Sequence, residues 1–226
     1  MTKYIDWIRY FEQNQWPEFP FAESPLLNPA ERDLITKSLR QFQLGEGAGG
    51  RTLRRLGAQF AQASGEAGYP RSLELFIAEE QRHSAMLGKF LDREGIARQR
   101  QDAADCLFRR VRKLWNHECM LMVLVSAECV AVPYYSALHD ATTSPLLRAL
   151  CRQILRDEAM HLNYQGQTLA KLANARTASW CWCRPCWSMA STARSAAPPA
   201  GRWRRFSARR FKLWVKWSDA CPAAPS

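Results

Sequence analysis

Two segments of the chain repeat one arrangement of side chains that can bind a metal ion. Glu79-Glu80-Gln81-Arg82-His83 and Asp157-Glu158-Ala159-Met160-His161 each place a glutamate three residues before a histidine, with a second acid directly ahead of the glutamate. Positions i and i+3 lie on the same face of an α-helix, so the carboxylate and the imidazole can reach the same ion. One such pair usually marks a solvated helix face, and its meaning depends on the face where it falls.

Both pairs interrupt the apolar face of a predicted helix. Glu80 and His83 stand among apolar residues spaced three or four positions apart, and Glu158 and His161 stand in a second stripe of this kind. The apolar members are Leu73, Phe76, Leu87 and Phe90 in the first stripe, and Leu147, Leu150, Ile154 and Leu172 in the second. An unpaired buried carboxylate is costly or takes up a proton, so a cation between the helices is the simplest explanation.

Two further glutamates interrupt apolar stripes in the same way. Glu46 lies on the inner stripe of the first long helical pattern, and Glu128 lies on that of the third. Four carboxylates would neutralise two divalent ions, and an oxygen-rich set with two imidazoles suits Fe(II) or Mn(II) better than zinc. We therefore expect two iron ions as cofactors, with manganese as the alternative.

The order of these residues resembles the ferritin-like di-iron carboxylate superfamily, in which two helices each give a glutamate and two others each give Glu-x-x-His. The acid before each glutamate is similar to the (Asp/Glu)-Glu-x-x-His motif of acyl-carrier-protein desaturases and their oxygenase relatives. The metal ligands that this resemblance implies are Glu46, Glu80, His83, Glu128, Glu158 and His161. Glu80 and Glu158 would bridge the metals as the catalytic carboxylates. The residues expected around the ligands are Glu79, Asp157 and Tyr135.

The helices that must carry these residues can be placed from caps, prolines and glycines. We expect helices over about residues 29–64, 70–94, 102–139 and 145–174, with a kink or break at Pro133. No segment shows sustained alternation of apolar and polar residues, so strands are not expected. The predicted fold is all-α, with a ferritin-like four-helix bundle over residues 29–174 and an N-terminal arm over residues 1–28, to which we assign a structural role.

Glycines surround the first predicted ligand, in the sequence Gly45-Glu46-Gly47-Ala48-Gly49-Gly50. Each glycine costs a helix interior up to about 1 kcal/mol relative to alanine, which leaves open a break of the first helix here. The stretch also fits Gly-x-Gly-x-x-Gly, but it follows a helical pattern and not a strand, so a dinucleotide site is not expected. Glycines beside a metal could instead leave room for a substrate or dioxygen channel.

Charge and composition limit the compartment and the partners. The net charge is +11, yet nine of the 32 Lys and Arg and one of the 21 acids follow residue 176, so the preceding residues carry only +3. We do not expect nucleic acid as a partner. The start of the chain lacks a signal-peptide pattern, and no apolar stretch approaches the roughly 18 residues of a membrane span, so we expect a cytoplasmic protein. The cysteines expected as reduced, small core residues are Cys106, Cys119, Cys129 and Cys151.

The last fifty or so residues differ in character from the rest. Six of the nine tryptophans lie after Arg176, among Arg, Ala, Pro and Cys in no helical order. Out-of-frame translation of a GC-rich gene gives this composition, so one hypothesis is a frameshift near residue 176. The alternative is a genuine basic tail whose aromatic residues touch an anionic membrane. We assign no function to Cys181-x-Cys183-x-x-Cys186.

Other groups that could do chemistry are less well placed. His117 and His139 each lie eleven residues from Glu128, so we expect them at the surface or behind the ligands. Tyr134 and Tyr135 could be redox-active, although core packing is the simpler expectation.

The predicted reaction follows from the predicted metals. Two Fe(II) ions can reduce dioxygen together, so we expect an O2-dependent oxidoreductase that desaturates, hydroxylates or N-oxygenates an organic substrate. The chain shows no flavin or iron–sulfur motif, so an external electron donor is a further expected partner. A homodimer is possible. The alternatives are a ferroxidase or peroxide-detoxifying protein with the same ligands, and a metal-free helical interaction module.

Overall fold

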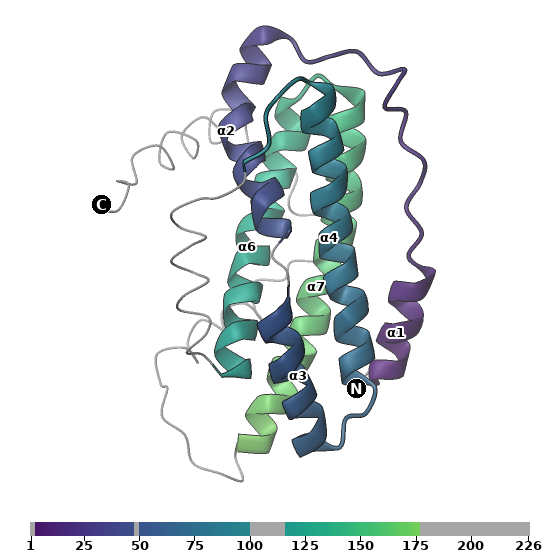
Figure 1. Ribbon diagram of the computed structural model, residues 1–226, viewed down its shortest axis with the longest axis vertical. Helices are drawn as coiled ribbons and strands as arrows, with labels where there is room; N and C mark the ends of the chain where they lie inside the picture. Colours follow the sequence, from purple (N-terminus) through teal and green to yellow (C-terminus); the bar gives the residue numbers. More distant parts are fainter. Residues whose placement is uncertain (1–2, 48–49, 100–115, 177–226) are drawn as a thin grey trace, which may run out of the picture.

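The computed structural model describes residues 3–47, 50–99 and 116–176. Within these ranges every regular element is a helix and no strand occurs, which confirms the all-α class for the part described. The helices are α1 (Tyr4–Gln13), α2 (Pro29–Glu46), α3 (Arg51–Ser64), α4 (Tyr69–Arg93), α6 (His117–Ala141) and α7 (Pro145–Arg176). Figure 1 shows α2 and α3 following one another along the length of the molecule, beside the longer helices α4, α6 and α7.

The long helices contact one another in a defined order. α6 packs along α7, while α4 contacts α2, α3 and α7, and α3 also reaches α6. α1 packs against α4, and the rest of the N-terminal arm continues from it without regular helix. The arm thus consists of one short helix, α1, and a following segment without regular secondary structure.

The first predicted helix is in fact two helices, because helical structure ends directly after Glu46 and resumes at Arg51. α2 ends at Glu46, and α3 starts at Arg51 with Gly50 as its N-cap in the left-handed region, at φ 56°. A side chain is disfavoured at that φ, so glycine permits the turn that separates the helices. The glycine-rich stretch, which suggested a helix break from the sequence, thus supplies the residue that permits the break, Gly50.

The second and fourth predicted helices match α4 and α7 closely. α4 ends one residue before its C-cap Glu94, and Gly95 then takes a left-handed φ of 66°. α2 begins as expected, since the Asn28 side chain accepts a hydrogen bond from the Glu31 amide at 2.9 Å. These ends are set by local signals that are visible in the sequence.

The third predicted helix, over residues 102–139, is described only in part. α6 begins at His117 after an Asn116 cap, and residues 102–115 lie outside the described residues, as do Cys106 and the tail. Pro133 lies inside α6 and does not end it. Among the described helices α6 alone is long and apolar enough to cross a membrane by length and composition, contrary to our expectation, although the core helix of a soluble protein passes the same test.

The buried apolar residues form two clusters with charged residues between them along the helices. On α4, Phe76 belongs to one cluster and Leu87 to the other, with Glu80 and His83 between them in sequence. On α7, Ile154 and Tyr164 flank Glu158 and His161 in the same way. The core is thus interrupted by a polar layer, and the fold positions that layer where four helices meet.

Of the three predicted core cysteines that lie in the described part of the chain, only Cys151 is fully buried. Cys119 is half-buried, and Cys129 is exposed on α6. The three are free thiols, as expected. The prediction of a core position is wrong for Cys129, because α6 is apolar on more of its surface than the helices around it cover.

Candidate metal centre

Six side chains from four helices converge in the polar layer. Glu46 comes from α2, Glu80 and His83 from α4, Glu128 from α6, and Glu158 and His161 from α7. They form two overlapping groups, Glu46, Glu80, His83 and Glu158 in one and Glu80, Glu128, Glu158 and His161 in the other. Within each group the candidate ligand atoms lie within 4.8 Å of one another. We call these six residues the carboxylate–histidine cluster; it could hold a metal ion.

The spacing inside the cluster suits ligands that share an ion. His83 Nδ1 lies 3.5 Å from Glu158 Oε1 and 3.7 Å from Glu46 Oε2. His161 Nδ1 lies 3.2 Å from Glu158 Oε2 and 4.0 Å from Glu128 Oε1. Ligand atoms bound to one ion at about 2.1 Å are separated by about 3 to 4 Å, so these distances fit.

Most of the cluster is buried, so its charged and polar atoms need partners within the protein. His83, Glu158 and His161 are fully buried, and Glu80 is the most exposed member, with 17% of its side chain accessible. The buried atoms His83 Nδ1 and Glu158 Oε1 make no hydrogen bond. Buried polar atoms nearly always have a hydrogen-bond partner. This ring nitrogen and this carboxylate oxygen lack a hydrogen bond and face one another, so they are the atoms that a cation would bind.

The carboxylates oppose one another electrostatically. Burial raises the pKa of Glu80 to about 8, with the neighbouring Glu158 and Glu46 adding to the shift against the attraction of His161. Burial also raises the pKa of Glu128 well above its ordinary value. Because these shifts express the cost of crowding anions away from water, a cation among the oxygens would lower that cost and displace the protons.

The pKa values of the two histidines are also raised, but the cause is the neighbouring carboxylates and not burial. Burial alone would lower the pKa of His83, but the carboxylates of Asp157, Glu158 and Glu46 outweigh it and the pKa is well above its ordinary value. The pKa of His161 is raised for the same reason. A metal would therefore compete with protons at both imidazoles as well as at the carboxylates.

The Nε2 atom of each histidine, which points away from the cluster, forms a hydrogen bond with an acid on the other helix. His83 Nε2 on α4 lies 3.1 Å from Asp157 Oδ2 on α7, and His161 Nε2 on α7 lies 3.0 Å from Glu79 Oε2 on α4. A carboxylate accepts hydrogen bonds, so each Nε2 carries a proton, and each Nδ1 faces the cluster, where it can bind an ion once its own proton is lost. The acid that precedes each glutamate in the sequence thus orients the imidazole of the partner motif.

Further hydrogen bonds hold the other carboxylates. Tyr135 donates to Glu46 Oε1 at 2.7 Å, and Gln165 donates to Glu128 Oε1 at 3.0 Å. Burial, together with Glu46, raises the pKa of Tyr135, so its proton stays on the phenol and in the hydrogen bond. Gln165 was not singled out from the sequence, although it lies one helical turn after His161 on the inner stripe of α7, which is a signal that could have found it.

The N-terminal arm also reaches the cluster, a contact that no sequence signal predicts. Trp16 donates to Asp157 Oδ2 at 2.9 Å and stacks on His83, with ring centroids 5.5 Å apart. A cleft of about 570 Å³ opens between the arm and α7 and is lined by Tyr10, Asn14, Gln15, Trp16, Pro17, Gln153, Arg156 and Asp157. The arm therefore does more than cover the bundle, because it contacts the acid that orients His83.

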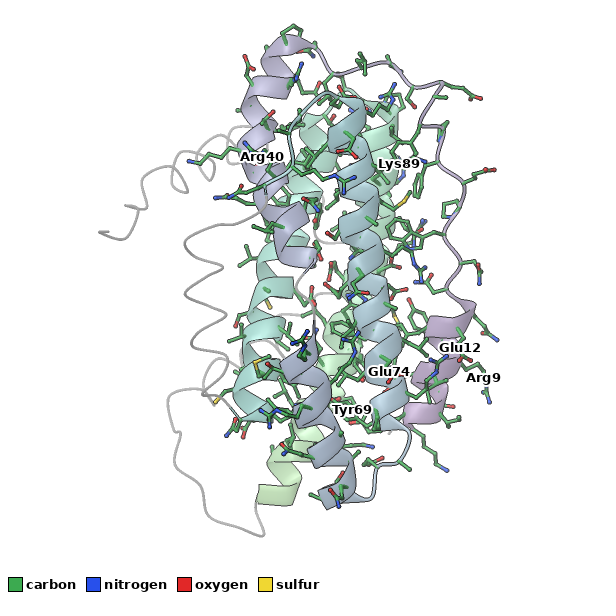
Figure 2. All side chains as sticks on the ribbon, viewed as in Figure 1. Arg9, Glu12, Arg40, Tyr69, Glu74 and Lys89 are labelled. Atoms are coloured by element: carbon green, nitrogen blue, oxygen red, sulfur yellow. The ribbon has the colours of Figure 1, made fainter. Side chains whose placement is uncertain are left out.

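The remaining candidates lie apart from the cluster. His117 is buried and not at the surface, and its Nε2 lies 2.9 Å from the Tyr69 hydroxyl. Figure 2 shows Tyr69 near the start of α4. His139 pairs with the neighbouring Asp140, and Tyr134 stacks on Phe42 in the core. The motif from Cys181 to Cys186 lies outside the described residues.

Comparison of the chain with protein-family models, with curated proteins and with solved structures finds no match. The geometry of the carboxylate–histidine cluster therefore carries the functional argument by itself.

Proposed function

We propose that the chain is a ferritin-like four-helix bundle, formed by α2 with α3, α4, α6 and α7, that holds two metal ions and catalyses an O2-dependent oxidation. The observation that supports this is the overlap of the two candidate ligand groups. Glu80 and Glu158 belong to both groups, while Glu46 with His83 and Glu128 with His161 belong to one each. Two shared carboxylates between two distinct sets of ligands is the arrangement expected for a bridged metal pair.

The donor set favours iron, with manganese as the alternative. Four carboxylates match the charge of two divalent ions, and no thiolate lies among the six ligands. A pair of ferrous ions supplies two electrons to dioxygen when bound. An oxidoreductase of the desaturase, hydroxylase or N-oxygenase type would then act on an organic substrate and take further electrons from an external donor.

The chain's own residues would prepare the site for that chemistry. Glu80 and Glu158 would hold both ions, and the Nδ1 atoms of His83 and His161 would each bind one. Asp157 and Glu79 keep those imidazoles in one orientation through their Nε2 protons. Apolar clusters on both sides exclude water, which strengthens every electrostatic contact inside the layer.

Anaerobic loading with Fe(II), followed by dioxygen, tests this function. We expect oxygen uptake in proportion to bound iron, and we expect the double variant Glu80→Ala, His161→Ala to show neither iron binding nor uptake. Product analysis with fatty acyl and amine substrates then identifies the reaction. Uptake that oxidises iron without any organic product would favour the ferroxidase alternative, and iron-loaded protein that consumes no oxygen would contradict the proposal.

A further inference from the structure

A single asparagine in the N-terminal arm contacts both of the acids that orient the histidines. Asn14 Nδ2 donates to Glu79 Oε1 at 2.5 Å and to Asp157 Oδ1 at 2.9 Å. The opposite oxygens of those two carboxylates accept from His161 and His83. The five side chains therefore form one continuous chain of hydrogen bonds, ordered His161, Glu79, Asn14, Asp157, His83.

The orientation of Asn14 follows from the chemistry of its neighbours. Ionised carboxylates only accept hydrogen bonds, so the amide NH2 and not the amide oxygen must face Glu79 and Asp157. Its backbone is held on two sides as well. The Asn14 N–H donates to the Tyr10 carbonyl at 3.0 Å as the C-cap of α1, and Arg82 donates to the Asn14 carbonyl at 2.9 Å.

The two acids need such a donor because both are buried. Glu79 and Asp157 are each 1% exposed and lie within hydrogen-bond distance of the same nitrogen, so their charges repel in a region of low dielectric. An NH2 group between them supplies one proton to each. Without it, each acid holds its histidine against the repulsion of the other acid, Glu79 Oε1 loses the Asn14 donor, and Asp157 Oδ1 keeps the hydrogen bond from Gln153 at 3.0 Å.

We propose that Asn14 is a positioning residue that fixes the orientation of His83 and His161 together, so that the arm sets the geometry of both halves of the cluster at once. The consequence for metal binding rests on the proposed function, whereas the effect on the imidazoles is a property of the chain alone. Trp16 differs in this respect, because it donates to Asp157 only and so acts on the His83 half.

The imidazole N–H protons of the metal-free protein, labelled with ¹⁵N-histidine, give the most direct test. In the wild type we expect two slowly exchanging Nε2–H signals, from His83 and His161. Asn14→Ala should speed the exchange of both at least tenfold, and Trp16→Phe should speed only that of His83. Asn163→Ala is the matched control, since Asn163 is exposed on α7 and donates to its own helix at 2.9 Å, and it should change neither.

Two results would overturn the proposal. One is a folded Asn14→Ala protein that keeps both slow signals or loses just one of them. The other needs no variant: Asn14 side-chain NH2 protons that exchange as fast as a free amide in the wild type would show that the bridge does not form.

Cobalt titration separates this inference from the proposed function. If the chain binds metal, Asn14→Ala should weaken Co(II) binding 10- to 100-fold at both positions and shift the absorption spectrum, whereas Asn163→Ala should do neither. A wild-type chain that binds no Co(II) would contradict the proposed function, and the proton-exchange result would still decide the role of Asn14.

Discussion

Glu158 is the carboxylate on which the two halves of the cluster depend. It is fully buried and faces both imidazoles, His83 Nδ1 at 3.5 Å and His161 Nδ1 at 3.2 Å. Burial acts to raise its pKa, but close contact with Glu128, the hydrogen bond with His161 and close contact with His83 reverse the effect and leave the pKa well below its ordinary value. Glu158 therefore remains ionised while the pKa values of Glu80 and Glu128 are raised.

Replacing this carboxylate should remove binding at both positions. We expect Glu158→Gln to lower the affinity for Co(II) at least 100-fold, or about 2.7 kcal/mol, because the amide is neutral and donates where an ion must be bound. Isothermal titration would measure it. Glu74→Gln, at an exposed position on α4, is the control and should bind as the wild type does. Equal affinities for the two variants would contradict the role of Glu158.

The types of the ligands and three of their neighbours, Glu79, Asp157 and Tyr135, could be predicted from the sequence, whereas the contact from the N-terminal arm could not. Glu80, His83, Glu158 and His161 stand out because each interrupts an apolar stripe at a fixed spacing. Asn14 carries no such signal, since it lies at the end of a short helix and its contacts are made with residues 65 and 143 positions away. Only the tertiary packing of the arm brings it to the acids.

The break between α2 and α3 shows that the position where a helix ends depends on packing as well as on helix propensity. Gly50 combines a left-handed φ of 56° with a close approach to α4, where an added Cβ would lie 2.8 Å from Ile77 Cδ1. The glycine run made a break conceivable, but the sequence does not state which glycine adopts the left-handed conformation. That choice depends on α4 lying against the turn.

Gly50→Ala should therefore destabilise the fold by roughly 1–3 kcal/mol, since it adds both backbone strain and a clash. Urea unfolding at constant pH would measure the change. Gly166→Ala is the matched control, because Gly166 lies within α7 with no atom within 4 Å of its added Cβ. That substitution should stabilise the protein by about 0.5–1 kcal/mol through helix propensity. Loss of stability in both variants alike would argue against strain at Gly50.

The start of α6 carries a buried histidine that should make stability depend on pH. Burial lowers the pKa of His117 to about 4, whereas an unfolded chain has a value of about 6.5. Below about pH 6.5 the unfolded state binds a proton at His117 and the folded state does not. The free energy of unfolding therefore decreases as the pH falls toward 4. His117→Gln keeps an acceptor for Tyr69 and has no such proton.

Between pH 7 and pH 5 we expect the wild type to lose roughly 2 kcal/mol more stability than His117→Gln. The comparison uses urea midpoints of the two proteins at each pH, so that the titration of the metal cluster cancels. A constant difference between the two proteins over this range would show that His117 is not held neutral.

Across the molecule, a charged layer separates two apolar clusters, and this arrangement links metal binding to stability. The fold must bring together four glutamates, two of them buried (Glu128 and Glu158) and two half-buried (Glu46 and Glu80), which disfavours the folded chain unless a cation offsets their repulsion. We expect saturating Co(II), at 100 times its dissociation constant, to stabilise the wild type by about 2.7 kcal/mol for each bound ion. Thermal unfolding with and without Co(II) would measure it, and Glu158→Gln should gain far less.

The all-α class was predictable because the long apolar stripes are explicit in the sequence. The position of the arm over the cluster was not, since its prolines and aromatic residues indicate packing but not where it packs. The burial of His117 was missed because an isolated histidine within a predicted helix resembles a surface residue. The prediction of a tail or a frameshift after residue 176 lies outside the described residues.

We propose that the six side chains of the carboxylate–histidine cluster bind a pair of ions. Elemental analysis of the purified protein after anaerobic Fe(II) loading and removal of free metal tests it directly. We predict two iron ions per chain for the wild type and fewer than about 0.2 per chain for the Glu80→Ala, His161→Ala double variant. Iron below that level in the wild type, or equal iron in both proteins, would contradict the account.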